Sequence, residues 1–158
     1  MTWLYNDEPF DQPQPEHYGF VYIIQNTQTG KSYIGKKLFW HKKTKILKGK
    51  KKRYLAESDW KSYYGSSIEL QKDVKEAGEQ AFQRKILHLC KSKSECSYYE
   101  GMEQFQRAVL FKPELYYNDW IIVRVHRKHV LNENATRNPL SQANKQARSK
   151  PTKGQHTD

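Results

Sequence analysis

Cysteine is scarce in this sequence, and acidic residues are outnumbered. Only two cysteines occur, Cys90 and Cys96, too few for a disulfide scaffold, and they do not form the Cys-x-x-Cys pair that is typical of structural zinc sites. The 17 Asp and Glu residues stand against 28 Lys and Arg, which leaves a net charge of +11. Such a charge on a short chain indicates a polyanionic partner, most often nucleic acid.

Long apolar runs are missing as well. No run approaches the roughly 20 residues that a membrane-spanning helix needs, and the first 18 residues lack both the basic start and the apolar core of a secretory signal. We therefore expect a cytoplasmic protein with no membrane partner. What the chain does have is aromatic residues, at 13%, against a hydrophobic fraction of only 36%. This predicts a small core rich in Tyr, Phe and Trp.

Three segments differ in composition. Residues 1–17 are acidic and rich in proline and are predicted to be an extended leader, residues 18–126 a single domain, and residues 127–158 a flexible basic tail. Within the domain, residues 31–61 carry 12 of the 28 Lys and Arg, most densely in a basic insertion at about 41–55. A solvated loop is one interpretation of this run. The aromatic residues interleaved with the charges favour contact with nucleic acid instead.

Hydrophobic patterns predict four strands and two helices. The strands are expected at 19–25, 31–37, 82–90 and 120–125, and the first two are joined by the polar loop 26–30. One helix is predicted from Ser66 or Ser67 to about residue 78, and a longer one over 93–111. In the longer helix the predicted buried stripe consists of Tyr98, Met102, Phe105 and Val109.

The first two strands carry a motif. Val21-Tyr22 and Tyr33-Ile34-Gly35, separated by a turn, resemble the signature of the GIY-YIG nuclease family, although the first triplet here reads Phe20-Val21-Tyr22. A basic region, a helix with a glutamate, and an asparagine after a proline follow in the family's order. The segment 57–66 and the pair Tyr99-Glu100 also resemble the phage-encoded branch of homing-type endonucleases. The resemblance covers roughly residues 19–125.

The resemblance implies an α+β fold: a small three-stranded antiparallel sheet flanked by helices, here followed by the basic tail. It also implies a metal-dependent DNA endonuclease that hydrolyses phosphodiester bonds in double-stranded DNA with one Mg²⁺ or Mn²⁺, in a bacterial or phage-infected cell. Because the chain has little room for a separate targeting domain, targeting is expected to be loose or to be supplied by a homodimer.

The resemblance also assigns roles to residues. Glu100 is the expected metal ligand, with Glu103 as the alternative. Tyr22 is the candidate base or orienting group, although it would need nearby cations to lower its pKa of ~10, and Tyr33 would position water or phosphate. The remaining catalytic candidates are a cation, Arg53 before Lys37, and a His or Tyr near the site, His41 or Tyr64. Gly35 and Asn118 are expected to support the structure. The lysines expected to contact DNA are Lys36, Lys42, Lys43, Lys50, Lys51 and Lys52.

Other interpretations stay open at this point. Tyr22 and Tyr33 are also what an ordinary buried strand would carry, and a helical glutamate such as Glu100 is usually a solvated surface residue. The alternative function is a non-catalytic nucleic-acid-binding protein on a degenerate nuclease fold. An RNA-binding protein is a third hypothesis, which the composition alone would favour.

Overall fold

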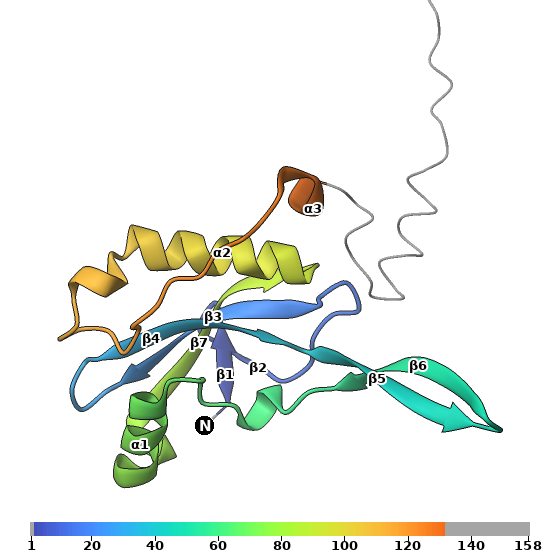
Figure 1. The fold of residues 1–158 in the computed structure, drawn as a ribbon. Coiled ribbons are helices and arrows are strands. Elements are labelled where there is room, and N and C mark those ends of the chain that lie inside the picture. The colour runs from blue at the N-terminus through green and yellow to red at the C-terminus, as the bar shows by residue number, and fades with distance from the viewer. Residues whose placement is uncertain (1, 132–158) are drawn as a thin grey trace, which may run out of the picture.

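A five-stranded mixed sheet with helices on both faces forms the body of the molecule, as the computed structural model shows for the residues that it describes, 2–131 (Figure 1). The strands lie in the order β2-β1-β7-β3-β4. Their bounds are β1 (Trp3–Tyr5), β2 (Glu8–Phe10), β3 (Gly19–Asn26), β4 (Ser32–Leu38) and β7 (Phe82–Cys90). Strand β3 is antiparallel to both β4 and β7, so the three strands expected from the family resemblance form the centre and one edge of this sheet.

The prediction of a three-stranded sheet was nevertheless wrong, because the expected extended leader folds onto the sheet. Strands β1 and β2 form a hairpin, and β1 pairs in parallel with β7 through Leu4 and Tyr5. Trp3 is 1% exposed and its indole N–H donates to the Trp60 carbonyl oxygen at 2.7 Å. Burying so large an aromatic side chain is strongly favourable, and this explains why residues 3–10 of the proline-containing leader join the sheet.

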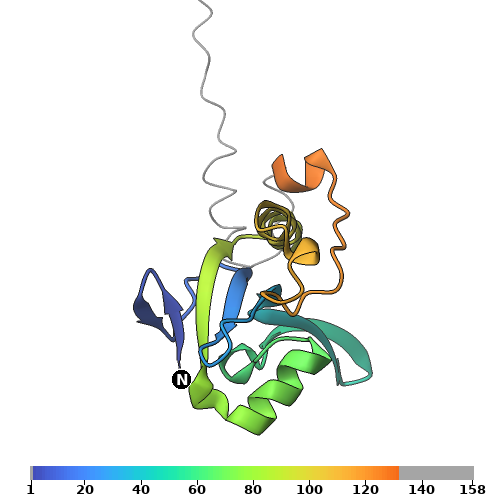
Figure 2. The same ribbon diagram turned by 90° about the vertical axis from the view of Figure 1, so that its left-hand side faces the viewer.

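The two faces of the sheet are covered by different elements (Figure 2). Alternate residues of β3 point to opposite faces: Phe20, Tyr22 and Ile24 join one apolar cluster, and Val21 joins the other. The first face is covered by η1 (Trp60–Ser62) and α1 (Ile68–Ala77), and the second by α2 (Lys93–Gln106). Short 3₁₀ turns and a last helix complete the described chain: η2 (Glu79–Ala81), η3 (Val109–Phe111) and α3 (Arg127–Leu131).

Both helices begin where predicted, but the longer one ends at Gln106 instead of residue 111, because Ala108 is left-handed (φ 51°) and η3 follows it. Ser67 caps α1 and Ser92 caps α2, each by accepting a backbone N–H three residues later. However, α2 turns a different face to the sheet than its apolar stripe predicted. Tyr98 and Phe105 are exposed, whereas the buried residues of the helix are Cys96, Gly101 and Gln104. Gly101 packs so closely on the chain that follows that a Cβ there would meet Val123.

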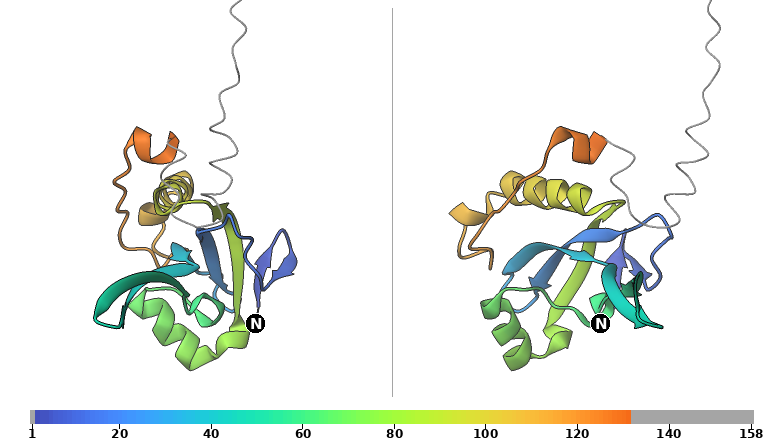
Figure 3. Two further views of the ribbon diagram at one scale, coloured as in Figure 1. Left: turned by 90° about the vertical axis from the view of Figure 1, so that its right-hand side faces the viewer. Right: turned by 45° about the vertical axis from the view of Figure 1, so that its right-hand side comes forward.

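The basic insertion is a second, separate sheet. Strands β5 (Trp40–Leu47) and β6 (Lys50–Glu57) pair along their whole length and are joined by the two-residue turn Lys48-Gly49, where both residues have positive φ. The hairpin projects away from the body (Figures 1 and 3).

The strand predicted at 120–125 is wrong: this segment has no regular secondary structure. It would have needed a free sheet edge, but residues 116–118 already occupy the outer edge of β4. Of the predicted basic tail, the structure describes only residues up to 131, where Arg127–Leu131 form α3. Residues 132–158 lie outside the described part of the chain. None of the described helices is both long enough and apolar enough to cross a membrane.

Candidate active site at the edge of strand β4

Beyond a single backbone bridge between Ser32 and Tyr116, the outer edge of β4 is held by side chains. Asn118 accepts a hydrogen bond from the Ile34 N–H at 3.0 Å and donates one to the Ile34 carbonyl at 2.7 Å. Gln104 of α2 donates to the same carbonyl at 3.1 Å. Two residues on, the Glu100 carboxylate accepts from the backbone of Lys36. Because unpaired edge groups are costly when buried, these polar side chains determine where α2 and residue 118 sit.

Gly35 allows the two motif tyrosines to approach each other. It lies opposite Tyr22 in the β3–β4 register, and the rings of Tyr22 and Tyr33 lie 6.2 Å apart. A Cβ at position 35 would come within 2.7 Å of Tyr22 Cζ and 2.9 Å of Tyr33 Cε1. Such distances are far below van der Waals contact, so any other residue here would push the tyrosines apart. The supporting role expected for Gly35 therefore has a direct steric basis.

The two phenols are neutral at physiological pH. Burial raises the pKa of Tyr22 well above its usual value, and the neighbouring Tyr63 and Tyr33 add to the shift. Burial also raises the pKa of Tyr33, whose hydroxyl exchanges a hydrogen bond with Ser66 Oγ at 2.9 Å. The cations that were expected to lower the pKa of Tyr22 do not outweigh its burial. Tyr22 and Tyr33 can therefore donate hydrogen bonds, but they are poor general bases.

Glu100 is largely buried at the same edge, with its side chain 15% exposed. Burial raises the pKa of its carboxyl group, against the opposing charge and backbone N–H of Lys36. Lys36 Nζ lies 4.0 Å from Glu100 Oε1, beyond hydrogen-bonding distance, and donates instead to Ser97 Oγ at 2.7 Å. Glu100 also influences the pKa of both Tyr22 and Tyr33. A carboxylate and two phenols thus share one electrostatic neighbourhood.

Lys37 brings a cation to the tyrosine side of the sheet. Its ammonium group lies 4.1 Å from the centre of the Tyr63 ring and forms an ion pair with Asp59 at 2.6 Å. Tyr63 in turn packs edge-on against Tyr22, with 6.0 Å between ring centres. Of the two cations considered from the sequence, it is therefore Lys37 that lies near the tyrosines.

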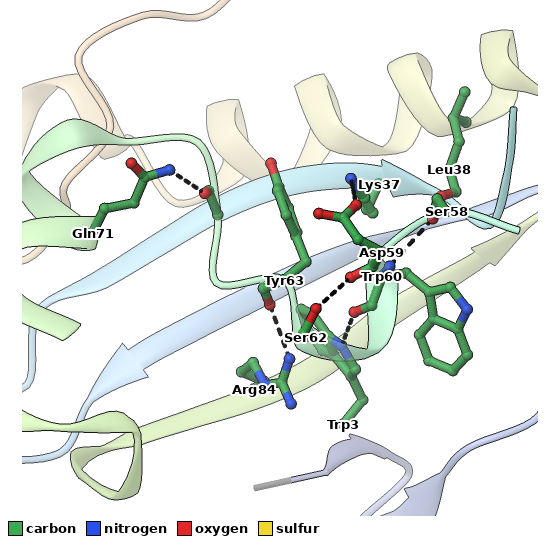
Figure 4. A network of polar contacts seen from close by, with 11 residues as sticks. Trp3, Lys37, Leu38, Ser58, Asp59, Trp60, Ser62, Tyr63, Gln71 and Arg84 are labelled. Carbon is green, nitrogen blue, oxygen red and sulfur yellow. Dashed lines mark hydrogen bonds and ion pairs between the residues drawn. The ribbon is translucent and has the colours of Figure 1, made fainter. Parts of the chain in front are cut away.

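The segment that carries Asp59 and Tyr63 crosses one face of the sheet and is held there by a side chain of the sheet itself (Figure 4). Arg84 of β7 donates to the carbonyl oxygens of Lys61 at 3.0 Å and Tyr63 at 2.9 Å. Its guanidinium lies over the rings of Trp3 and Tyr64, 4.6 and 4.2 Å from their centres. The N-terminal hairpin thus supports the site indirectly, through Trp3.

Several residues expected at the site lie elsewhere. Arg53 is exposed on the β5–β6 hairpin, opposite Thr44, and His41 is exposed at the base of the same hairpin. Tyr64 turns toward Arg84 instead of toward the tyrosine pair. Its neighbour Tyr63 takes the place beside Tyr22, because consecutive residues in extended backbone point in opposite directions.

The lysines expected to contact DNA divide into two groups. Lys36 belongs to the β4 edge. The other five lie exposed on the hairpin: Lys42, Lys43, Lys50, Lys51 and Lys52.

The alternative metal ligand, Glu103, is engaged by other groups. It accepts from His88 at 2.8 Å and from Arg107 at 3.0 Å. Burial alone would raise the pKa of Glu103, but these two partners outweigh burial and lower it. Within residues 2–131 there is no cluster of three or more His, Cys, Asp or Glu side chains that could hold a metal ion. Of the two glutamates considered from the sequence, Glu100 is therefore the one that is not already held by two side-chain partners.

An open groove of about 850 Å³ adjoins Tyr33. Ser66, Lys72, Asn118 and the exposed Trp120 are among the residues that line it. The groove makes Tyr33 accessible from solvent, whereas Tyr22 is fully covered.

A comparison with known protein families gives one match: the family described as "Putative endonuclease segE, GIY-YIG domain", over residues 3–121. The chain belongs to this GIY-YIG family. The match includes the β1–β2 hairpin, in agreement with its place in the sheet; compared with the region of 19–125 that the motifs indicated, it begins earlier, at residue 3, and ends slightly sooner, at residue 121. No curated protein and no solved structure matches the chain significantly.

Three residues beside the tyrosine pair have no role among the expectations from the sequence: Tyr63, Asp59 and Ser66. All three lie in the segment 57–66, which resembles phage-type members. The sequence pattern that could have identified them is the run Tyr63-Tyr64-Gly65-Ser66, but this run does not show which of its two tyrosines faces the sheet. Gly65 has a φ of +87° and a Cβ there would clash with Leu70, so this turn is held close to α1.

Proposed function

We propose that this GIY-YIG protein is a divalent-metal-dependent endonuclease that hydrolyses phosphodiester bonds of double-stranded DNA at the edge of β4. The observation that carries the proposal is the arrangement around Gly35. Two phenols packed over a glycine share an electrostatic neighbourhood with Glu100, while Lys37 lies beside Tyr63 on the same side. This is the set of groups that charge stabilisation at a phosphate requires.

The residues at the edge fit a hard divalent cation that keeps most of its waters. Glu100 would hold Mg²⁺ or Mn²⁺ through a single carboxylate, and substrate and water oxygens would complete the shell. The Lys36 ammonium group is not hydrogen-bonded to this carboxylate. When bound, such an ion supplies charge neutralisation at the phosphate and a water of lowered pKa.

The chain's own residues supply orientation and charge. In the proposed site Tyr33, which is reachable from the groove, donates a hydrogen bond to a phosphate oxygen or to the attacking water. Tyr22 is buried behind it and fixes its position. The ammonium group of Lys37 faces the negative charge that develops on the phosphate. The raised pKa values of both phenols keep these donors protonated at neutral pH.

Cleavage of supercoiled plasmid in Mg²⁺ or Mn²⁺ tests this proposal. We expect Glu100→Gln and Tyr33→Phe each to reduce the cleavage rate about 100-fold or more, and a chelator to abolish cleavage by the wild type. Lys37→Gln should reduce it more than Arg53→Gln does, because only Lys37 lies near the tyrosines. Equal rates for wild type and Glu100→Gln would refute the catalytic proposal.

Two observations favour a second function, DNA binding without cleavage. Tyr22 is only 1% exposed, so it does not reach a substrate directly, and the charge of Lys37 is already paired with Asp59. If the wild type binds DNA tightly but leaves plasmid intact with both metals, this second function is the correct one.

A further inference from the structure

We infer that the β5–β6 hairpin is a DNA-binding ribbon that contacts duplex DNA with one of its two faces. The inference goes beyond cleavage and rests on the proposed function only for the nature of the polyanion. The hairpin makes few contacts with the body of the protein, since residues 41–54 are exposed on both strands. A two-stranded ribbon on its own is marginally stable in water, so a hairpin that lies off the core is best explained by a surface that it binds.

The strand register sorts the hairpin's side chains into two faces. Alternate residues on each strand share a face, and cross-strand partners share it too. One face, called here the lysine face, carries His41, Lys43, Lys45, Leu47, Lys50, Lys52, Tyr54 and Ala56. The opposite face carries Trp40, Lys42, Thr44, Ile46, Lys51, Arg53, Leu55 and Glu57. Both faces carry apolar residues, but the lysine face has four lysines and no acidic residue, whereas the opposite face has three cations and a glutamate.

The base of the hairpin shows which way each face points. On the opposite face, the Trp40 indole donates to the His17 carbonyl at 3.2 Å, and Glu57 accepts from Trp60 at 2.9 Å, so this face turns toward the body of the protein. On the lysine face, His41 at the base of the hairpin is exposed. The opposite face is thus the one that contacts the body, and the lysine face is left open to solvent.

Charge repulsion on the lysine face argues for a polyanion. Lys45 lies directly opposite Lys52 across the strands, and like charges in that position destabilise a strand pair. Ion pairs bind Lys31 and Lys37 to nearby carboxylates, but no carboxylate shares the face with Lys45 and Lys52. A row of phosphates would relieve this repulsion.

The shape of the hairpin favours duplex DNA over duplex RNA. Strands of eight residues are about 26 Å long, and the major groove of B-form DNA admits a two-stranded ribbon. The major groove of A-form RNA is too narrow for side chains to enter. The exposed Tyr54 lies among these lysines and adds a planar surface for contact with the sugar–phosphate backbone.

Two matched double variants test the face assignment in the full chain carrying Glu100→Gln, so that no cleavage disturbs the measurement. Lys45→Gln/Lys52→Gln removes two charges from the lysine face, and Lys42→Gln/Lys51→Gln removes two from the opposite face. Binding to a fluorescent DNA duplex several helical turns long is measured over a series of salt concentrations. We expect the lysine-face variant to bind roughly ten-fold more weakly and to lower the salt slope by about 2. The opposite-face variant should change the slope by less than about 1.

Thermal unfolding separates binding from folding. The lysine-face variant should have an unchanged or higher Tm, since it removes a repulsive pair, and a lower Tm would overturn the assignment. Equal losses of affinity in both variants, or no loss in either, would also overturn it. If the protein binds a duplex RNA of the same sequence as tightly as the DNA, duplex DNA is not its specific partner and the inference fails. The titrations are run with divalent metal chelated, and the duplex is checked for cleavage afterwards, so a failure of the catalytic proposal leaves this result unaffected.

Discussion

The edge of β4 and the β5–β6 hairpin are both strand edges on one polypeptide, and they are stabilised in opposite ways. At the β4 edge, Ile34 and Lys36 have their outward backbone groups bound by Asn118, Gln104 and Glu100. On the hairpin, both strands are exposed from residue 41 to residue 54 and carry lysine after lysine. Charged residues, lysine in particular, are a common protection of an exposed edge against unwanted pairing. The β4 edge is thus covered by hydrogen-bonding side chains, and the hairpin is protected by its charge.

The difference teaches where a substitution should matter. At the β4 edge, contacts are buried and specific, so a change there should lower stability and disturb the tyrosines together. On the hairpin, a change should alter affinity for a polyanion and leave the free energy of unfolding within about 0.5 kcal/mol. The following predictions test this contrast, from the largest expected effect to the smallest.

Gly35→Ala should have the largest effect. The new methyl group would meet both tyrosine rings, and Tyr22 is enclosed by Trp3 and Tyr63 and cannot move aside. We expect a loss of about 3 kcal/mol in the free energy of unfolding and loss of cleavage, measured by chemical denaturation and plasmid assay. Adding Tyr22→Phe removes the hydroxyl nearest the clash and should restore part of the stability. An Ala variant as stable as the wild type would contradict the steric role of Gly35.

Asn118→Ala should cost about 2 kcal/mol, because it leaves the buried Ile34 N–H without its partner. Denaturant titration measures the change. Gln106→Ala, at an exposed position on α2, is the control and should be nearly neutral. If both variants lose the same free energy of unfolding, the Asn118 hydrogen bonds to β4 do not stabilise the fold as described.

Glu100→Gln should separate stability from activity. Burial raises the pKa of Glu100 in the folded state, so its favourable contribution is full below the unfolded value of about 4.3 and is lost as pH rises through the raised value. At neutral pH the buried, ionised carboxylate therefore destabilises the folded state, and the Glu100→Gln variant should be at least as stable as the wild type. The two Tm values should converge as pH falls below about 4. A variant that is less stable at pH 7 would show that the Lys36 contacts outweigh burial.

Asp59→Asn should have the smallest effect on stability. A hydrogen bond from Lys37 lowers the pKa of Asp59, so the pair's contribution is present above about pH 3.9 and is lost as pH falls through the lowered value. Because Asp59 is 68% exposed, solvent screening should keep the loss at neutral pH below about 1 kcal/mol. It should shrink further in high salt, as thermal unfolding at two ionic strengths would show. A loss that does not respond to salt would contradict this assignment.

The parts of the fold that follow local rules were predictable. The three central strands, the loop between the first two and the Ser92 cap of α2 follow from hydrophobic patterning, turn chemistry and capping. The buried face of α2 did not follow, because hydrophobic periodicity assumes that a helix packs on an apolar surface. Here α2 packs on the second face of the sheet through Cys96 and also reaches the edge of β4, where Gln104 is buried because it donates to the Ile34 carbonyl, while Tyr98 and Phe105 stay exposed.

The hairpin was missed for a related reason. Its strands lack the apolar-polar alternation of a half-buried sheet, since neither of its faces is buried over most of its length. The two-residue turn Lys48-Gly49 was the available signal, but lysine is not among the residues usually found with positive φ. The sequence shows where the basic run lies, but its conformation, a hairpin, depends on the pairing between β5 and β6.

By itself, the sequence determined the family motif, the central strands and the excess of positive charge, because each depends on residues close together in the chain. Only the tertiary structure decided which tyrosine joins Tyr22 and Tyr33, which cation lies beside them, and that Trp3 belongs to the fold. These choices depend on packing between distant segments: Arg84 and Trp3 hold the chain at Tyr63, and Asp59 holds Lys37. Since two neighbouring residues in an extended segment point opposite ways, only a long-range clamp of this kind distinguishes Tyr63 from Tyr64.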